Sequence, residues 1–172
     1  MSYTIVVVIR KYSPRDMRQV AELIHKTFSK YNFNEGTPEA IQTYLDKYDS
    51  EKMGEKQVRE RLESTNIFFV AVENKKIVGM VRGIKGRLVN LFVDGKYHGK
   101  GIGKKLMQNF EEKGFDERNA INVKSSIFAV SFYTSIGFKK TTGQRNMRGL
   151  FVQPMKKVRK SFWLVEREWI EI

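Results

Sequence analysis

Residues 91–106 read LFVDGKYHGKGIGKKL, and this stretch decides the fold. An apolar, strand-like run passes into a glycine-rich loop, after which a helix begins. Glycines let a backbone approach an anion closely, and the unpaired N–H groups at a helix start point toward it. The glycines and the lysines that add positive charge are Gly99, Gly101, Gly103, Lys100, Lys104 and Lys105. The stretch predicts a phosphate-binding loop. The alternative is a tight turn that uses glycine only because its backbone needs a positive φ.

Two other kinds of phosphate loop do not fit this stretch. A nucleoside-triphosphate loop needs Gly-x4-Gly-Lys-Ser/Thr, and no such run occurs. The dinucleotide fingerprint needs Gly-x-Gly-x-x-Gly, but its third glycine falls on Lys104 when counted from Gly99 and on Leu106 when counted from Gly101. The sequence therefore disfavours a nucleotide triphosphatase and a dinucleotide oxidoreductase.

Strand and helix patterns flank the loop on both sides. Runs of β-branched and aromatic residues between turn residues predict strands at 5–9, 67–72, 77–84, 88–93, 120–123, 138–142 and 150–155. Apolar residues at three- and four-residue spacing after capping residues predict helices at 14–31, 37–48, 49–63, 104–114 and from Ser125 or Ser126 to Ile136. Neither an internal repeat nor a dividing linker is visible, so we expect one domain.

The composition narrows the class of protein. The 172 residues are 41% hydrophobic and 30% charged, which is typical of a single globular domain. The absence of cysteine excludes disulfides, thiolate metal sites and cysteine nucleophiles, and a reducing, cytoplasmic setting fits. The longest apolar runs are too short to span a membrane, and we expect no membrane partner.

The charge balance indicates an anionic partner. The chain carries 32 Lys and Arg against 19 Asp and Glu, a formal net charge of +13. A nucleic acid, an anionic membrane surface and a polyanionic cofactor are all compatible with this excess, and so is a lysine-rich solvated surface. Net charge alone does not choose among them.

Two motifs occur together in this sequence. The first has the spacing Arg/Gln-x-x-Gly-x-Gly/Ala, present here as His98-x-x-Gly101-x-Gly103. The second is an alanine, then Phe-Tyr, then Gly-Phe, present within 129–138. Together they resemble the GNAT superfamily of acyl-CoA N-acyltransferases. The resemblance implies an α+β fold with three α/β/α layers, in which a mixed, mostly antiparallel sheet of about six to seven strands is flanked by about four helices. It covers residues 1–158 and leaves 159–172 as an extension.

The resemblance also implies acetyl-CoA as a co-substrate, bound in a V-shaped splay between the strand before the loop and the strand after the next helix. The backbone of Leu91, Phe92 and Val93 would pair with the pantetheine arm, as an added strand would. The pyrophosphate would be held by His98, Gly99, Lys100, Gly101, Ile102, Gly103 and Lys104. His98 departs from the usual Arg or Gln. Ser126 departs from an asparagine that contacts pantetheine, and its shorter side chain would reach the ligand through water.

Tyr133 is the residue predicted to assist the chemistry. A phenol near the sulfur of a thioester can donate a proton or a hydrogen bond to the departing thiolate; a core-packing tyrosine is the alternative. The sequence does not identify the general base that would take a proton from the incoming amine, because the nearby candidates Arg87 and Asn90 are not suited to that role. Glu35 and Tyr31 fit the family geometry, as does a chain of water molecules. With two histidines and no cysteine, no metal site is expected.

These observations predict an N-acetyltransferase that moves an acetyl group from acetyl-CoA to a primary amine of a small molecule or peptide, by direct attack in a ternary complex. A basic nucleic-acid-binding module and a catalytically silent CoA-binding protein are the alternatives; the nucleic-acid reading is disfavoured because the aromatic residues fall within apolar runs. The acceptor is unidentified, and the loops at 32–36 and 143–149 would form its site. Residues 158–172 predict an amphipathic helix, with a strand at 162–165 as the alternative. This segment would pack on its own domain or at a dimer contact, so a monomer and a homodimer both remain open.

Overall fold

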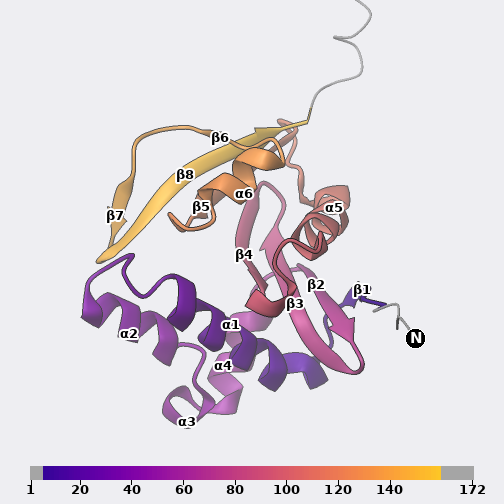
Figure 1. Ribbon diagram of the computed structural model, residues 1–172, viewed down its shortest axis with the longest axis vertical. Coiled ribbons are helices and arrows are strands. Elements are labelled where there is room, and N and C mark those ends of the chain that lie inside the picture. The colour runs from indigo at the N-terminus through magenta and orange to yellow at the C-terminus, as the bar shows by residue number, and fades with distance from the viewer. Residues whose placement is uncertain (1–5, 160–172) are drawn as a thin grey trace, which may run out of the picture.

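The computed structural model describes residues 6–159, which form a mixed sheet between two layers of helices (Figure 1). The strand order is β1-β2-β3-β4-β5-β8-β6, with β7 paired to β8. All neighbouring strands are antiparallel except β4 and β5, which are parallel. The strands are β1 (Val8–Lys11), β2 (Ile67–Glu73), β3 (Lys76–Ile84), β4 (Arg87–Val93), β5 (Ala120–Ser125), β6 (Lys139–Lys140), β7 (Arg145–Met147) and β8 (Leu150–Val158).

Six α-helices lie in the described part of the chain, and two 3₁₀ turns, Pro14–Asp16 and Gly95–Tyr97, precede helices. Thr37 begins α2 as expected, because its Oγ1 accepts a hydrogen bond from the Ala40 amide at 3.2 Å. Gly137, with φ +95°, ends α6 in the left-handed conformation that the sequence predicted. The helices are α1 (Met17–Tyr31), α2 (Pro38–Asp46), α3 (Ser50–Met53), α4 (Glu55–Glu63), α5 (Ile102–Gly114) and α6 (Val130–Ser135).

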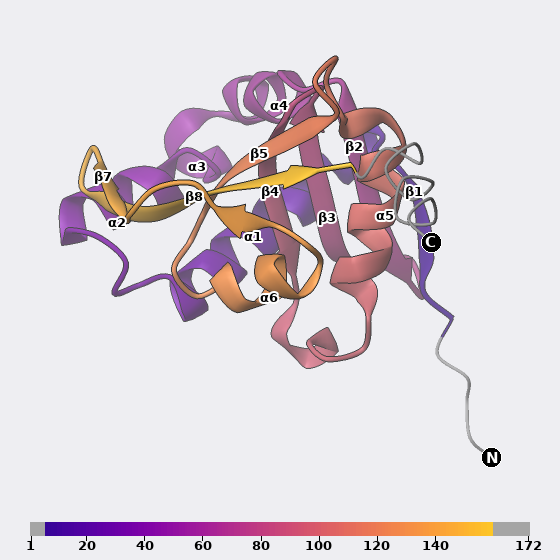
Figure 2. The ribbon, with the colours of Figure 1, turned by 90° about the horizontal axis from the view of Figure 1, so that it is seen from above.

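The alternation of side chains along β2 gives the sheet two apolar faces. Phe68 and Val70 point into a core shared with α1 and α4. Ile67 and Ala71 point to the opposite side, where α5 and α6 supply the packing. Figure 2 shows α5 and α6 on the near side of the sheet. The three-layer arrangement predicted from the sequence is therefore present.

The structure differs from the expected elements in four main places. The first strand was expected at 5–9, but β1 spans Val8–Lys11, the stretch that pairs with β2. The sheet has eight strands within residues 6–159, because the exposed residues 145–147 form β7 without any apolar alternation to signal it. The charged stretch 49–63 is two helices, broken at Gly54 with φ +81°. Finally, α6 begins at Val130 and not at Ser125 or Ser126, because residues 126–129 form a turn in which the Ser126 carbonyl accepts from the Ala129 amide.

The described chain ends at Arg159, which is anchored to the domain. Its amide donates to the Asn119 carbonyl at 2.8 Å, and its guanidinium lies 4.4 Å from the centroid of the Phe115 ring. The amphipathic helix expected at 158–172 lies almost wholly outside the described residues. Between residues 6 and 159, none of the helices has both the length and the apolar character that crossing a bilayer requires.

The packing of α5 against the sheet is testable at Leu106, which is fully buried and lies against Gly79 of β3. Leu106→Ala should lower the free energy of unfolding by about 2–5 kcal/mol, because the lost contacts leave a cavity. Urea denaturation measures this change. Gln108→Ala, at an exposed position of the same helix, is the matched control and should stay within about 0.5 kcal/mol of the wild type. Equal stability of the two variants would contradict this account of the core.

Candidate active site

The parallel strands β4 and β5 pair at a single register position, Arg87 with Asn122. The amide and the side chain of Asn122 both donate to the Gly86 carbonyl, at 2.9 and 3.1 Å, and fix this junction. Beyond it the strands diverge, and Figure 2 shows β5 and β8 crossing the direction of β3 and β4. The splay implied by the family resemblance is thus a feature of this sheet.

A cleft of about 150 Å³ opens between the diverging strands. Leu91 and Phe92 line it from β4, and Ser126 lines it from the turn after β5. Val93, predicted with them, does not line this cleft, and its carbonyl oxygen lies 2.8 Å from Nε2 of His98. Where β4 faces the cleft it has no strand beside it, which is the edge that an extended ligand can join.

Tyr133 closes the inner side of this cleft from α6. Its side chain is 4% exposed and lies edge-on to Phe132 and Phe138, with ring centroids 5.4 and 5.3 Å away. Burial raises the pKa of the Tyr133 phenol, since desolvation disfavours the charged phenolate. The residue is therefore both a core tyrosine and a cleft residue, with a hydroxyl that stays protonated at neutral pH.

The glycine loop follows β4 directly and is anchored at Asp94. Asp94 accepts from the Lys96 amide at 3.1 Å and pairs with Nζ of Lys26 in α1 at 2.8 Å. Burial raises the pKa of the Asp94 carboxyl, but the hydrogen bonds from Lys26 and Lys96 outweigh it and leave the pKa below its ordinary value. The carboxylate thus fixes the start of the loop to α1.

The three motif glycines have different surroundings. Gly99 and Gly101 have φ of +75° and +78°, and a Cβ added to either would meet no atom within 4 Å. A Cβ on Gly103 would instead lie 3.0 Å from the Phe132 ring, so this glycine allows α5 and α6 to approach each other. The loop thus leaves its backbone open at the first two glycines, and α5 begins immediately after them at Ile102. This open backbone at a helix start fits a phosphate group.

The side chains of the loop are only partly available to a ligand. Lys100 and Lys104 are exposed, and Nζ of Lys100 lies 5.0 Å from the centroid of the Tyr97 ring. His98 turns toward the protein, with Nε2 against the Val93 carbonyl and its ring 5.0 Å from that of Tyr31. His98 therefore braces the loop on β4, a contact that its position in the motif did not predict.

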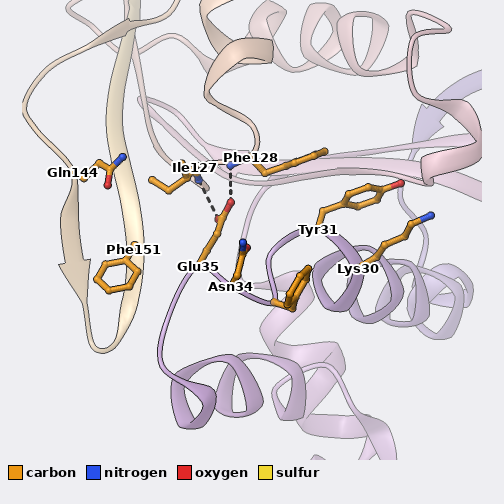
Figure 3. Close-up of a pocket in the computed structure, with 9 residues that line it drawn as sticks. Lys30, Tyr31, Asn34, Glu35, Ile127, Phe128, Gln144 and Phe151 are labelled. Atoms are coloured by element: carbon orange, nitrogen blue, oxygen red, sulfur yellow. Dashed lines mark hydrogen bonds between the residues drawn. The ribbon is translucent and has the colours of Figure 1, made fainter.

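Glu35 holds the turn that leads into α6 (Figure 3). Its side chain is buried, and its two carboxylate oxygens accept from the amides of Ile127 and Phe128 at 3.0 and 2.6 Å. Asn32 adds a third hydrogen bond at 3.0 Å. A carboxylate occupied in this way is poorly placed to take a proton from an incoming amine, so the structure gives Glu35 a clamping role in place of the role of a base. The partners are 92 and 93 residues away in sequence, beyond the reach of local pattern analysis.

A buried arginine fixes the far wall of the cleft. Arg82, 3% exposed, donates to the carbonyls of Arg61 and Leu62 at the end of α4, to the Tyr48 hydroxyl and to Oδ1 of Asn90. The amide of Asn90 in turn donates to the hydroxyl of Tyr44 at 3.1 Å. Asn90 and Tyr44 line the cleft. Burial, with Tyr48 nearby, raises the pKa of Tyr44 well above its ordinary value, so this phenol is also neutral. The one feature of the sequence that could have indicated this network is the presence of an arginine inside an apolar strand.

A wider vestibule of about 600 Å³ adjoins the cleft and shares Glu35 and Phe151 with it. It contains the loop at 32–36 that was expected to form the acceptor site, whereas the loop at 143–149 contributes Gln144 to the lining. Backbone hydrogen bonds join the two loops, from Thr37 to Gly149 and from Phe151 to Glu35, each at 2.8 Å. The remaining lining residues are Lys30, Tyr31, Phe33, Asn34, Ile127 and Phe128.

Comparison with known proteins gives one family and several related structures. The family model for the acetyltransferase (GNAT) domain matches residues 32–159. The PaiA N-acetyltransferase of Thermoplasma acidophilum, solved in complex with coenzyme A, is 24% identical, with a TM-score of 0.67 over 90% of this chain and 99% of that one. A GCN5-related N-acetyltransferase of Rhodopseudomonas palustris is 18% identical, with a TM-score of 0.75 over 92% and 100%. An aminoglycoside 6'-N-acetyltransferase complexed with coenzyme A is 17% identical, with a TM-score of 0.63 over 90% and 99%. At these identities the structural likeness shows a shared fold.

The clamp at Glu35 predicts a stability change. Glu35→Gln keeps the size of the side chain but sets an amide N–H against one of the two backbone amides. The free energy of unfolding should fall by about 1.5–3 kcal/mol, the usual contribution of hydrogen bonds to a charged group. Glu39→Gln, exposed in the first turn of α2, removes the same charge and should cost about 0.3–1 kcal/mol. Chemical denaturation of both variants measures these free energies of unfolding. An unchanged free energy of unfolding in Glu35→Gln would show that the clamp does not stabilise the fold.

Proposed function

The chain belongs to the GNAT acetyltransferase family, and from this premise we propose that it transfers the acetyl group of acetyl-CoA to a primary amine while both substrates are bound. The observation that supports this most is the cleft between the diverging β4 and β5, which has a buried, protonated Tyr133 on its wall and an open glycine loop directly after β4. We assign the catalytic domain to residues 1–158 and treat 159–172 as an extension.

In this proposal the backbone of Leu91 and Phe92 pairs with the amide groups of the pantetheine arm. Val93 contributes its backbone amide, because its carbonyl lies against His98. Ser126 reaches the arm from the opposite wall through water. The loop amides from Gly99 to Gly103 and the first turn of α5, with Ile102 and Lys104, face the pyrophosphate. Lys100 adds positive charge at the exposed rim. His98 links the loop to β4 through the Val93 carbonyl.

The chemical step is aminolysis of a thioester. The amine nitrogen attacks the thioester carbonyl carbon, the new C–N bond forms, and the C–S bond breaks to release a thiolate. The surplus proton of the amine leaves through water, since the oxygens of Glu35 already accept three hydrogen bonds. Because burial raises the pKa of Tyr133 further above that of a thiol, which is about 8.5, the phenol stabilises the departing thiolate chiefly by hydrogen bonding.

Release of CoA provides a direct assay of this function. The chain has no cysteine, so a thiol reagent reports released CoA without background from the protein. Acetyl transfer to amines should appear as amine-dependent thiol release. Binding of CoA without release in the presence of any amine would instead identify a catalytically silent CoA-binding protein.

Tyr133→Phe tests the donor, because it removes the hydroxyl and keeps the ring. The turnover number should fall about 10²–10³-fold, the usual effect of losing one preorganised donor, with CoA affinity almost unchanged. A raised pKa leaves the phenol protonated above its ordinary pKa of about 10, so the wild-type rate should show no alkaline decline from tyrosine ionisation up to that pH. Tyr12→Phe, remote from the cleft, is the control. Retention of turnover within about threefold by Tyr133→Phe, far below the expected range, would leave Tyr133 a packing residue.

Gly101→Val tests the glycine loop. A side chain there would occupy the open space in front of the loop, and CoA binding measured by calorimetry should be lost. Gly54→Val is the control for a valine at an open glycine of positive φ, because Gly54 lies between α3 and α4 with a φ of +81°. Its ψ of 143° differs from the 1° of Gly101, so circular dichroism of both variants checks that they are folded. In the wild type, CoA affinity should fall as salt rises, since the phosphates face exposed lysines. Equal CoA affinity in the two valine variants would remove the loop from the site.

A further inference from the structure

We propose that the acceptor is a primary amine on an aromatic or apolar skeleton that carries no second positive charge, and that polyamines and aminoglycosides are poor substrates. The inference rests on the proposed function and names the substrate class of that site. It follows from the charges and the exposed surfaces of the vestibule and the cleft.

The first argument is the scarcity of free carboxylates. Among the described residues that line the two cavities, Glu35 is the one acidic side chain. Its oxygens accept from Ile127, Phe128 and Asn32, which uses three of the roughly four acceptor positions of a carboxylate. A polycation loses hydration at each ammonium group when it enters a cavity and needs a paired anion in exchange. The lining has no set of free anions to offer.

The second argument is that cations stand where such anions would be needed. Lys30 lines the vestibule, and Lys124 lines the cleft. The chain as a whole carries a formal charge of +13. Each further ammonium group on an acceptor therefore meets like charge, both at long range and at the site. A single ammonium group meets this repulsion only once and loses its charge before it attacks.

The third argument is the apolar surface at the entrance. Phe33, Phe128 and Phe151 are 65%, 50% and 43% exposed, and all three line the vestibule. Phe128 is stacked on Tyr31, with ring centroids 4.7 Å apart. Figure 3 shows Phe128 and Tyr31 on the α1 side of Glu35 and Phe151 on the β8 side. Aromatic groups exposed on two sides of a cavity favour an apolar ligand, and their faces also attract one ammonium group.

The backbone that carries Phe128 is also fixed in advance. The amide of Phe128 is held by Glu35 at 2.6 Å, so the ring projects from an anchored turn. A preformed aromatic surface binds a planar group without the loss of loop entropy that an unanchored one would incur. The clamp and the exposed ring thus act together on the acceptor.

The test compares amines at physiological salt by thiol release. 2-Phenylethylamine and a peptide with N-terminal phenylalanine represent the two sources of the proposed chemistry. Butylamine is an apolar amine of the same class without a ring, and spermidine and kanamycin are the polycationic comparisons. We expect kcat/KM for the better aromatic amine to exceed that for spermidine and for kanamycin at least about tenfold, as differences in apolar contact commonly produce. A higher kcat/KM for 2-phenylethylamine indicates a small-molecule acceptor, and a higher kcat/KM for the peptide indicates a peptide N-terminus. Spermidine or kanamycin matching the aromatic amines would overturn the proposal.

Two substitutions make the test specific. Phe128→Ala should lower kcat/KM for the aromatic amine about tenfold and change butylamine much less. Lys30→Glu should raise kcat/KM for spermidine several-fold, whereas Lys75→Glu, an equal charge change at the turn between β2 and β3, should not. An unaltered preference in both Phe128→Ala and Lys30→Glu would overturn the assignment of these surfaces.

Calorimetric binding of the same amines to the CoA-loaded protein separates this proposal from the one it rests on. Tighter binding of the aromatic amine than of spermidine, without thiol release, would support the ligand preference of the vestibule and contradict acetyl transfer. Thiol release with spermidine preferred would support acetyl transfer and contradict the acceptor class.

Discussion

The single pairing position between β4 and β5 is the constraint on which the rest of the structure depends. Parallel neighbours in a sheet ordinarily exchange hydrogen bonds along their length, and here they exchange them only around Arg87 and Asn122. Past that point the two halves of the sheet must be held together by something other than the ladder. The opening becomes a cleft because helices pack across it and because polar side chains tie its walls to distant elements.

Two charged side chains provide those ties. Glu35 joins the loop after α1 to the turn before α6, and so fixes the wall that carries Tyr133. Arg82 joins β3 to the end of α4 and, through Asn90, to the opposite wall. Its partners are carbonyls, an amide oxygen and a hydroxyl, and within residues 6–159 no carboxylate forms an ion pair with it. Helix-terminal carbonyls carry partial negative charge, which offsets part of the cost of burying this cation.

The sequence predicted the elements whose structure depends on neighbouring residues in the chain. It did not predict the features that are fixed by contacts between residues far apart in the sequence. The meander, the glycine loop and the start of α2 follow from local patterns, and all are present. The hairpin strand β7 was missed because its exposed residues are ordered by pairing with β8. The start of α6 was placed too early, because its preceding turn is held by Glu35, more than 90 residues away. Glu35 was considered as a base because the sequence does not show its distant partners, whose N–H groups donate to its carboxylate oxygens. The bracing of the loop by His98 had no signal in the motif.

In the proposed reaction, the positive charge of the protein acts in opposite ways on the two substrates. A basic surface raises the local concentration of a ligand that carries several phosphates. The same field, with Lys30 and Lys124 in the lining, disfavours an ammonium group in the cleft, and so does transfer of that group into apolar surroundings. In the proposed reaction, both effects favour the neutral form of an entering amine, which is the nucleophile. A site of this kind needs less help from a general base, which accords with a lining whose one carboxylate is committed to the backbone.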